Sequence, residues 1–152
     1  MKNKIILYIL IIFWMGLIFY FSHQPSVQSD SVSNGLMAKI IDIVEVAINH
    51  EFSESEIENI YEYGITPLRK GAHLSIYFIL GILIYCLVKE YKLDKKKIFI
   101  ISLLLCMLYA CSDEIHQLFI FGRSGEIRDV LIDTFGSLTG IFITSKILKN
   151  KF

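Results

Sequence analysis

The sequence predicts an all-α polytopic membrane protein, in which four transmembrane helices form a bundle and a helical extracytoplasmic loop joins the first two. Three observations carry this prediction: a mean hydropathy of +0.55, four separated apolar segments, and charges concentrated between those segments. With 152 residues and only two prolines, the chain is expected to form one domain, residues 1–152, without a long disordered tail.

A helix needs roughly 20 residues to cross a bilayer, with about 17 as the lower limit. The apolar segments run from Ile5 to Phe21, Ala72 to Val88, Ile98 to Cys111 and Ile127 to Ile147. The third is long enough only if the helix continues to Gln117, and the fourth only if it includes Asp129 and Asp133. We therefore predict spans near 5–21, 72–88, 98–117 and 127–147, with polar residues at membrane depth or at the interface.

The first segment also has one property of a signal peptide, because Lys2 and Lys4 precede its apolar run. The run ends in Phe19 to Pro25, however, which lacks a small-x-small cleavage site. The aromatic residues there are typical of a membrane interface, so a retained helix is the favoured interpretation.

The distribution of basic residues predicts the orientation. With the amino terminus in the cytoplasm, ten of the fifteen basic residues, all lysine, lie on the cytoplasmic side, and thirteen of the fifteen acidic residues lie on the opposite side. This asymmetry agrees with the positive-inside tendency. We expect a multi-pass protein of the bacterial cytoplasmic membrane with both termini in the cytoplasm and the polar ends of all four helices on the outer side.

The outer loop, residues 22–71, contains two helical patterns. Met37, Ile41, Val44 and Ile48 recur at helical spacing and predict an amphipathic helix on the membrane or over the bundle, with Ser33 or Asn34 as its cap. A shorter helix is expected to begin with the capping box of Ser53 and Glu56 and to end at Gly64 and Pro67. We expect these two helices to form a hairpin packed against the outer ends of the spans, and favour this interpretation over a lid that covers a site.

Within the spans, polar residues follow helical spacing and should share faces. The three stripes are Arg69, His73, Tyr77 and Gly81 on the second span, Asp113, His116 and Gln117 on the third, and Asp129, Asp133, Gly136 and Gly140 on the fourth. The glycine pair has the spacing of a close-packing seam. Glu114 lies about 100° around its helix from Asp113 and is expected to face lipid headgroups.

Taken singly, most of these residues have a purely structural explanation. His73 could hydrogen-bond a neighbouring helix, Arg69 and Lys70 could extend to lipid phosphates, and Asp129 could complement a helix amino terminus. Asp133, one turn deeper, fits none of these. Because ionisable groups near a bilayer core are costly, their placement at one side favours a shared polar site.

Several classes of function are disfavoured. Cys86, Cys106 and Cys111 lie in or at the ends of apolar runs, which indicates free buried thiols rather than disulfides or a cysteine metal site. The chain has no basic patch interleaved with aromatics and no glycine-rich phosphate loop, so a nucleic-acid partner is not expected. No cofactor follows from the sequence.

Four motifs, in order along most of the chain, resemble the VanZ-like family of bacterial membrane proteins. They are Phe21-Ser22-His23-Gln24-Pro25, Arg69-Lys70-Gly71-Ala72-His73 with Tyr77, Ser112-Asp113-Glu114-Ile115-His116-Gln117 with Arg123, and Asp129-Val130 through Asp133 to Gly136 and Gly140. The resemblance implies a small integral membrane protein, in a family named for a member associated with low-level teicoplanin resistance. It also implies asparagine in many relatives at position 133, where this chain has aspartate.

The first functional hypothesis is an enzyme that acts on a lipid-linked or headgroup substrate at the outer leaflet. Its candidate catalytic residues are His73, Asp113, His116, Asp129 and Asp133, and its candidate substrate-binding residues are Arg69, Lys70, Glu114, Gln117 and Arg123. His116 or His73 would transfer protons while Asp113 orients that histidine, and Arg69 and Arg123 would hold an anionic phosphate.

Two metal variants remain open at this stage. Asp129 and Asp133 could hold Mg²⁺ or Ca²⁺, or His73, Asp113, His116 and Asp133 could form a ligand set. No span contains an HExxH-like pair and no obvious nucleophile is present, so we assign no metal ligand from the sequence.

The second hypothesis is a non-catalytic accessory protein that binds an anionic lipid headgroup, a lipid-linked wall precursor or the drug. Transport or proton relay is a third class, which four short helices without an inverted repeat support weakly. The bilayer is the expected partner in every case.

Overall fold

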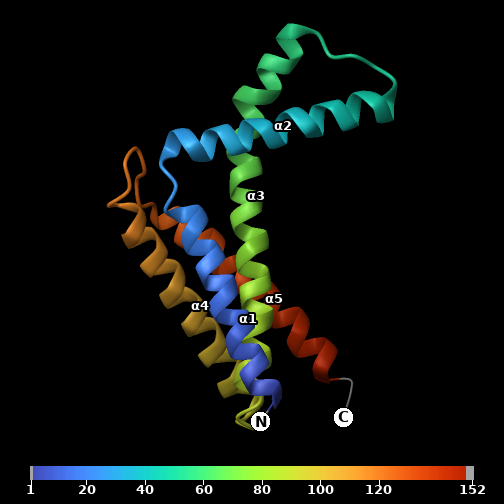
Figure 1. The fold of residues 1–152 in the computed structure, drawn as a ribbon. Coiled ribbons are helices and arrows are strands. Elements are labelled where there is room, and N and C mark those ends of the chain that lie inside the picture. Colours follow the sequence, from blue (N-terminus) through green and yellow to red (C-terminus); the bar gives the residue numbers. More distant parts are fainter. Residues whose placement is uncertain (1, 150–152) are drawn as a thin grey trace.

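The structure is a computed structural model that describes residues 2–149, and this range contains five α-helices and no β-strand (Figure 1). The helices are α1 (Lys2–Ser22), α2 (Ser26–Ile48), α3 (Glu54–Lys89), α4 (Lys95–Gln117) and α5 (Ile127–Lys149). All except α2 are long and apolar enough to cross a membrane. The predicted all-α fold with four membrane-spanning helices is therefore confirmed.

The bundle consists of α1, α4, α5 and the carboxy-terminal part of α3, while α2 crosses one end of it (Figure 1). As the length argument required, α4 continues to Gln117, and both Asp129 and Asp133 lie within α5. The start of α1 and the end of α5 lie at the same end of the bundle, away from α2 (Figure 1). The polar residues at the α2 end therefore come from elements that are far apart in the sequence.

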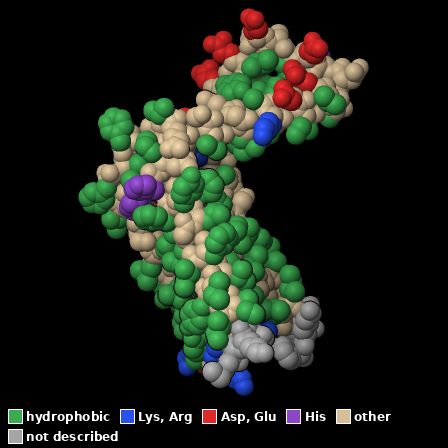
Figure 2. Space-filling model, viewed as in Figure 1, with side chains coloured by type: hydrophobic (Ala, Val, Ile, Leu, Met, Phe, Trp, Pro, Cys, Tyr) green, Lys and Arg blue, Asp and Glu red, His purple; other side chains and the backbone are tan. Residues whose placement is uncertain are grey.

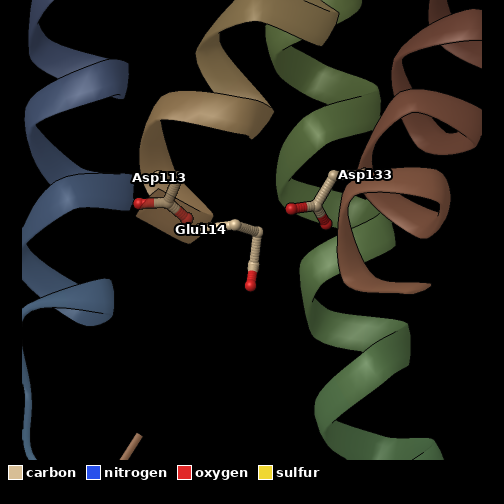
Figure 3. Close-up of side chains that lie close together, drawn as sticks. All are labelled: Asp113, Glu114 and Asp133. Carbon is tan, nitrogen blue, oxygen red and sulfur yellow. The ribbon is translucent and has the colours of Figure 1, made fainter. Parts of the chain in front are cut away.

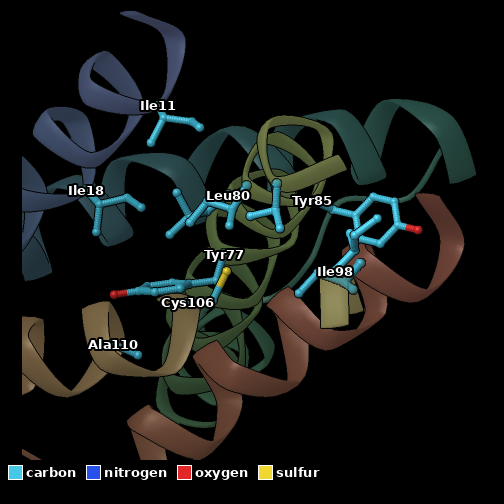
Figure 4. Packing of buried hydrophobic residues seen from close by; sticks show 11 residues of the cluster. Ile11, Ile18, Tyr77, Leu80, Tyr85, Ile98, Cys106 and Ala110 are labelled. Atoms are coloured by element: carbon cyan, nitrogen blue, oxygen red, sulfur yellow. The ribbon is translucent and has the colours of Figure 1, made fainter. Parts of the chain in front are cut away.

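One continuous apolar cluster fills much of the interior of the bundle (Figure 4). Leu80 and Cys106 are fully buried, whereas Phe13 and Leu108 on the outer surface are 63% and 62% exposed, as expected for side chains that face lipid. Side-chain hydrogen bonds to backbone carbonyls attach α1 to its neighbours: the indole of Trp14 donates to Ile76 O (2.9 Å) and the hydroxyl of Tyr109 donates to Met15 O (2.7 Å).

The closest helix packing joins α3 and α5 through glycine. A Cβ added at Gly136 would collide with the carbonyl oxygen of Leu74, and one added at Gly140 would collide with that of Phe78. On the other helix of the pair, Gly81 of α3 leaves room for the backbone of Ser137 in α5. The predicted glycine seam is thus confirmed, because only residues without a side chain allow the two backbones to approach so closely.

The amphipathic helix in the outer loop is longer than predicted. It begins at Ser26 rather than after Ser33 or Asn34, and Pro25 is its N-cap. The amides of Gln28 and Ser29 both donate to Pro25 O, at 3.0 and 3.1 Å. Proline suits this place because the first turn of a helix leaves backbone donors unused in any case.

The prediction that the second outer helix ends at Gly64 and Pro67 is wrong. The capping box of Ser53 and Glu56 is present, but the helix it opens is α3, which continues through Pro67 to Lys89. Proline removes one hydrogen bond from a helix. Tertiary contact stabilises the segment before it, since an added Cβ at Gly64 would lie 2.7 Å from the terminal methyl group of Met37 in α2.

Charges separate along the long axis of the molecule. Figure 2 shows acidic side chains on the hairpin of α2 and early α3, and basic side chains at the opposite end of the bundle. Lys151, which entered the orientation argument, lies outside the described residues, as do the side chains of Lys2 and Lys149. All three cysteines are free, and Cys106 is the buried one.

Candidate functional site

Three carboxylates meet inside the bundle at the end nearest α2. Asp113 and Glu114 belong to α4 and Asp133 to α5, with exposed fractions of 3%, 5% and 0%. Each contributes an oxygen to a group whose atoms all lie within 4.8 Å of one another. Figure 3 shows Asp133 extending from α5 toward the two residues on α4. We call Asp113, Glu114 and Asp133 the carboxylate cluster.

Asp113 is held by the end of α1 and by its own helix. The hydroxyl of Ser22 donates to Asp113 Oδ2 at 2.8 Å, and the amide nitrogen of Gln117 lies 3.4 Å from the same oxygen. The other oxygen, Oδ1, is buried and has no hydrogen-bond partner among the described residues. Asp113 therefore has one fixed oxygen and one unused oxygen.

Glu114 faces the interior, so the expectation that it faces lipid headgroups is wrong. Its Oε2 accepts a hydrogen bond from the backbone amide of Glu126 (2.9 Å), and its Oε1 accepts one from Gln117 (3.2 Å). The connection between α4 and α5 folds back to supply the Glu126 amide. This non-local bond compensates for the burial of Glu114.

Asp133 is fully buried, and neither of its oxygens accepts a hydrogen bond within the described part of the chain. The nearest basic group is His73 of α3, whose Nδ1 lies 3.6 Å from Asp133 Oδ1. That separation is longer than the donor–acceptor distance of a hydrogen bond. The glycine seam positions this pair, because Gly136 brings α5 against α3 one turn away.

The remaining charged candidates form ion pairs nearer the surface. Lys70 Nζ lies 3.4 Å from Asp129 Oδ1, and Arg69 lies 3.7 Å from Asp30 of α2. Pairs at this degree of exposure contribute little to stability. Asp129 therefore forms an ion pair with Lys70, whereas Asp133 belongs to the carboxylate cluster.

His116 is not a member of the carboxylate cluster and contacts residues at the end of α1. Its Nε2 is 3.2 Å from His23 Nδ1, and its ring stacks on Phe19 at a centroid distance of 4.4 Å. No hydrogen bond joins Asp113 to His116 among the described residues, so Asp113 does not hold this histidine directly. Ser22 at the end of α1 is the partner of Asp113, and His23 in the turn after α1 is the partner of His116.

Arg123 connects the turn after α4 to the end of α1. Its Nε donates to Gln24 O at 3.1 Å, and one terminal nitrogen lies 3.5 Å from Phe21 O. Burial and the neighbouring charge of Arg69 lower the pKa of Arg123 from its ordinary value. Two guanidinium groups therefore share one region of positive charge.

A pocket of about 190 Å³ opens beside these residues, between the end of α1, α2 and α3. Arg69, Arg123 and His73 give it a basic side, and its walls are mainly apolar. The apolar lining includes Phe21, Val32, Leu36, Leu68, Ala72 and Ile76. His73 thus lies between the pocket and the carboxylate cluster. We call this cavity the arginine pocket.

Ser22, His23 and Asp30 were not assigned from the sequence, although each contacts a candidate residue. Ser22 and His23 lie within the first of the four motifs, and that was the available signal. Which of their neighbours they would contact depends on the packing of α1 against α4, and no spacing within one helix reveals it.

The comparisons with known proteins agree with this architecture. The family model VanZ/LLP1 matches residues 6–149, which includes all four candidate spans and every residue of the two sites. No curated protein and no solved structure is significantly similar to the chain. The match confirms the resemblance inferred from the four motifs, and the chain belongs to the VanZ/LLP1 family.

Proposed function

We propose that this membrane protein of the bacterial cell envelope binds an anionic lipid-linked or cell-wall component from the outer side of the membrane. The observation that carries the proposal is the arginine pocket, which combines two guanidinium groups with apolar walls. A phosphate-bearing headgroup matches the first feature, and an acyl or isoprenyl chain matches the second.

Guanidinium suits this ligand because its planar group of donors can form two parallel hydrogen bonds to phosphate oxygens. Arg69 and Arg123 lie close enough for one charge to affect the other. Such a pair is costly without an anion, and the partner of Arg69, Asp30, is half-exposed. A ligand phosphate would compensate both cations more completely than Asp30 alone.

The proposed orientation places the arginine pocket outside and both termini in the cytoplasm. Its basis is the lysine-rich end of the bundle opposite α2, which the positive-inside tendency would assign to the cytoplasm. In the same orientation the acidic hairpin of α2 and α3 would project from the outer surface, where wall precursors are exposed.

A catalytic function is the second candidate, and His73 is the observation that favours it. Its imidazole lines the arginine pocket while its Nδ1 faces the buried Asp133 at 3.6 Å. A histidine oriented by a carboxylate can transfer a proton to or from a bound substrate. In that case His73 and Asp133 would act together, and Asp113 would contribute negative charge.

Either activity could contribute to tolerance of glycopeptides such as teicoplanin by changing which lipid-linked precursors the drug can reach. In the enzymatic case the precursor itself changes. In the non-catalytic case the protein only covers the precursor or binds the lipid-tailed drug.

Replacing Arg69 with glutamine should weaken binding of anionic lipid by at least about tenfold, because a charge-assisted hydrogen bond contributes about 1.5–3 kcal/mol. Delipidated protein in detergent would be titrated with phosphatidylglycerol and, separately, with phosphatidylcholine, and bound lipid counted by native mass spectrometry. Arg69→Gln should lower the affinity for phosphatidylglycerol more than that for phosphatidylcholine, because the choline cation of phosphatidylcholine already offsets the charge of its phosphate.

Arg128→Gln is the matched control, since Arg128 is exposed at the start of α5 and lies outside the arginine pocket. It removes the same charge and should bind phosphatidylglycerol as the unmodified protein does. Equal affinities for Arg69→Gln and the unmodified protein would contradict the proposal. Equal losses in both variants would show that only net charge matters.

A further inference from the structure

The carboxylate cluster has an unbalanced charge. Three carboxylates lie in a region where all three side chains are at least nine-tenths buried, and isolated ions are very costly there. The groups that face them are the hydroxyl of Ser22, the amide of Gln117, the backbone amide of Glu126 and the imidazole of His73. Of these, only His73 can carry a positive charge. The charges of Arg123 and His116 also act on the cluster, but neither group forms an ion pair with it among the described residues, so three carboxylates have at most one cation in direct contact.

The pattern of satisfied oxygens indicates where a counter-ion would bind. The protein's own donors occupy Asp113 Oδ2 and both oxygens of Glu114. Asp113 Oδ1 and both oxygens of Asp133 are buried without a hydrogen-bond partner among residues 2–149. A fully buried carboxylate with two unused oxygens that faces two further carboxylates (Figure 3) requires either protons or a cation.

The geometry suits a single ion. The three contributing oxygens lie within 4.8 Å of one another, and oxygens on opposite sides of Ca²⁺ are about 4.6–5.2 Å apart, twice its usual 2.3–2.6 Å ligand distance. Carboxylate oxygens are the preferred ligands of hard divalent cations, whereas zinc and copper sites use nitrogen and sulfur. Cys106 and Cys111, on the same helix, are not members of the group.

We propose that Asp113, Glu114 and Asp133 bind a hard divalent cation, Mg²⁺ or Ca²⁺, inside the bundle. Ser22, Gln117 and the Glu126 amide orient two of the ligands from behind, as outer-shell hydrogen bonds do at other metal sites. His73 is then the link to the arginine pocket. The proposal goes beyond the proposed function and does not depend on it, because it concerns a cation rather than the anion held by Arg69 and Arg123.

The ligand residues come from two helices, and their supporting donors come from α1 and from the connection between α4 and α5. A bound cation would therefore stabilise the assembled end of the bundle. Without a cation, mutual repulsion among the three carboxylates should destabilise the same end.

Binding of Mn²⁺, a paramagnetic substitute for Mg²⁺ and Ca²⁺, tests the site directly. Full-length protein in detergent would be treated with a chelator, desalted and titrated with Mn²⁺ while free Mn²⁺ is measured by electron paramagnetic resonance. The unmodified protein should show one saturable site from which Mg²⁺ or Ca²⁺ displaces Mn²⁺. Asp133→Asn should weaken that binding at least about tenfold, and Asp42→Asn, at an exposed acid of α2, should leave it unchanged.

Thermal unfolding provides a second measurement, in which the order of stability of the unmodified protein and Asp133→Asn depends on whether a cation is present. Added Ca²⁺ or Mg²⁺ should raise the unfolding temperature of the unmodified protein and not that of Asp133→Asn. In chelator, Asp133→Asn should be the more stable of the two, because it removes repulsion. If Asp133→Asn does not fold, Glu114→Gln and Asp113→Asn take its place, each with the same expected loss.

Absence of saturable Mn²⁺ binding by the unmodified protein would overturn the proposal and indicate that protons neutralise the cluster. Unchanged affinity in all three cluster variants would overturn it equally, by placing the ion elsewhere. Neither result bears on lipid binding at Arg69, which the phosphatidylglycerol titration measures separately.

Discussion

Gly140→Ala is expected to destabilise the folded bundle by about 1–3 kcal/mol, the usual cost of overpacking a close contact. The added methyl group would collide with the carbonyl oxygen of Phe78 and lie 3.1 Å from its carbonyl carbon. Backbone atoms cannot rotate away as a side chain can, so α3 and α5 must separate. The change would be measured as the shift in the midpoint of unfolding when SDS is added to protein in mild detergent.

Gly71→Ala is the control, because a Cβ at Gly71 of α3 has no atom within 4 Å. Alanine is favoured over glycine inside a helix by roughly 0.5–1 kcal/mol, so this variant should be unchanged or slightly more stable. We therefore expect Gly140→Ala to lower the stability of the folded bundle and Gly71→Ala to leave it unchanged or raise it slightly. Equal stability of Gly140→Ala and the unmodified protein would contradict the close approach of α3 and α5.

Ala72→Trp is expected to abolish selective binding of anionic lipid while the protein remains folded. Ala72 lines the arginine pocket and is exposed, so an indole ring can occupy the cavity without entering the core. A volume of about 190 Å³ leaves little room for both this ring and a headgroup. The measurement is the difference between phosphatidylglycerol and phosphatidylcholine binding by native mass spectrometry, with helix content followed by circular dichroism.

Ser75→Trp places the same ring one turn further along α3, at an exposed position outside the pocket lining. It should retain lipid selectivity. Selectivity that survives in Ala72→Trp would mean that the headgroup binds elsewhere, and loss in both variants would indicate a general effect of tryptophan on α3.

The four spans could be predicted because crossing a bilayer sets a minimum length for an apolar helix. That requirement also showed that Asp129 and Asp133 must lie inside a helix. The glycine seam was equally accessible, since Gly136 and Gly140 share a face with Asp133 and small residues allow close helix packing.

The sequence did not predict that α3 continues through Pro67. Gly64 and Pro67 are local signals for a helix end, and they were overridden because α2 packs on this segment through Met37. The position of α2 depends in turn on the turn at Pro25 and on Arg123, which donates to Gln24 O. The contacts of Met37 with Gly64 and of Arg123 with Gln24 connect residues that are far apart in the sequence.

The same limitation applies to the candidate site. Helical spacing correctly placed His73 and Asp133 on faces that could meet, but it could not show that Glu114 turns inward to accept the Glu126 amide. His116 shares a helical face with Asp113, yet its partner is His23, in the turn after α1. Single-helix geometry predicts which residues share a face, and packing between helices determines the partner of each.

Photo-crosslinking in native membranes tests most directly whether the arginine pocket holds an anionic lipid. A photoreactive amino acid would replace Leu36, which lines the pocket, or Leu108, which faces outward on α4. The lipids captured at position 36 should be enriched in negatively charged headgroups relative to those at position 108, and Arg69→Gln should remove the enrichment. The same lipid mixture at both positions, or an enrichment that persists without Arg69, would contradict the account.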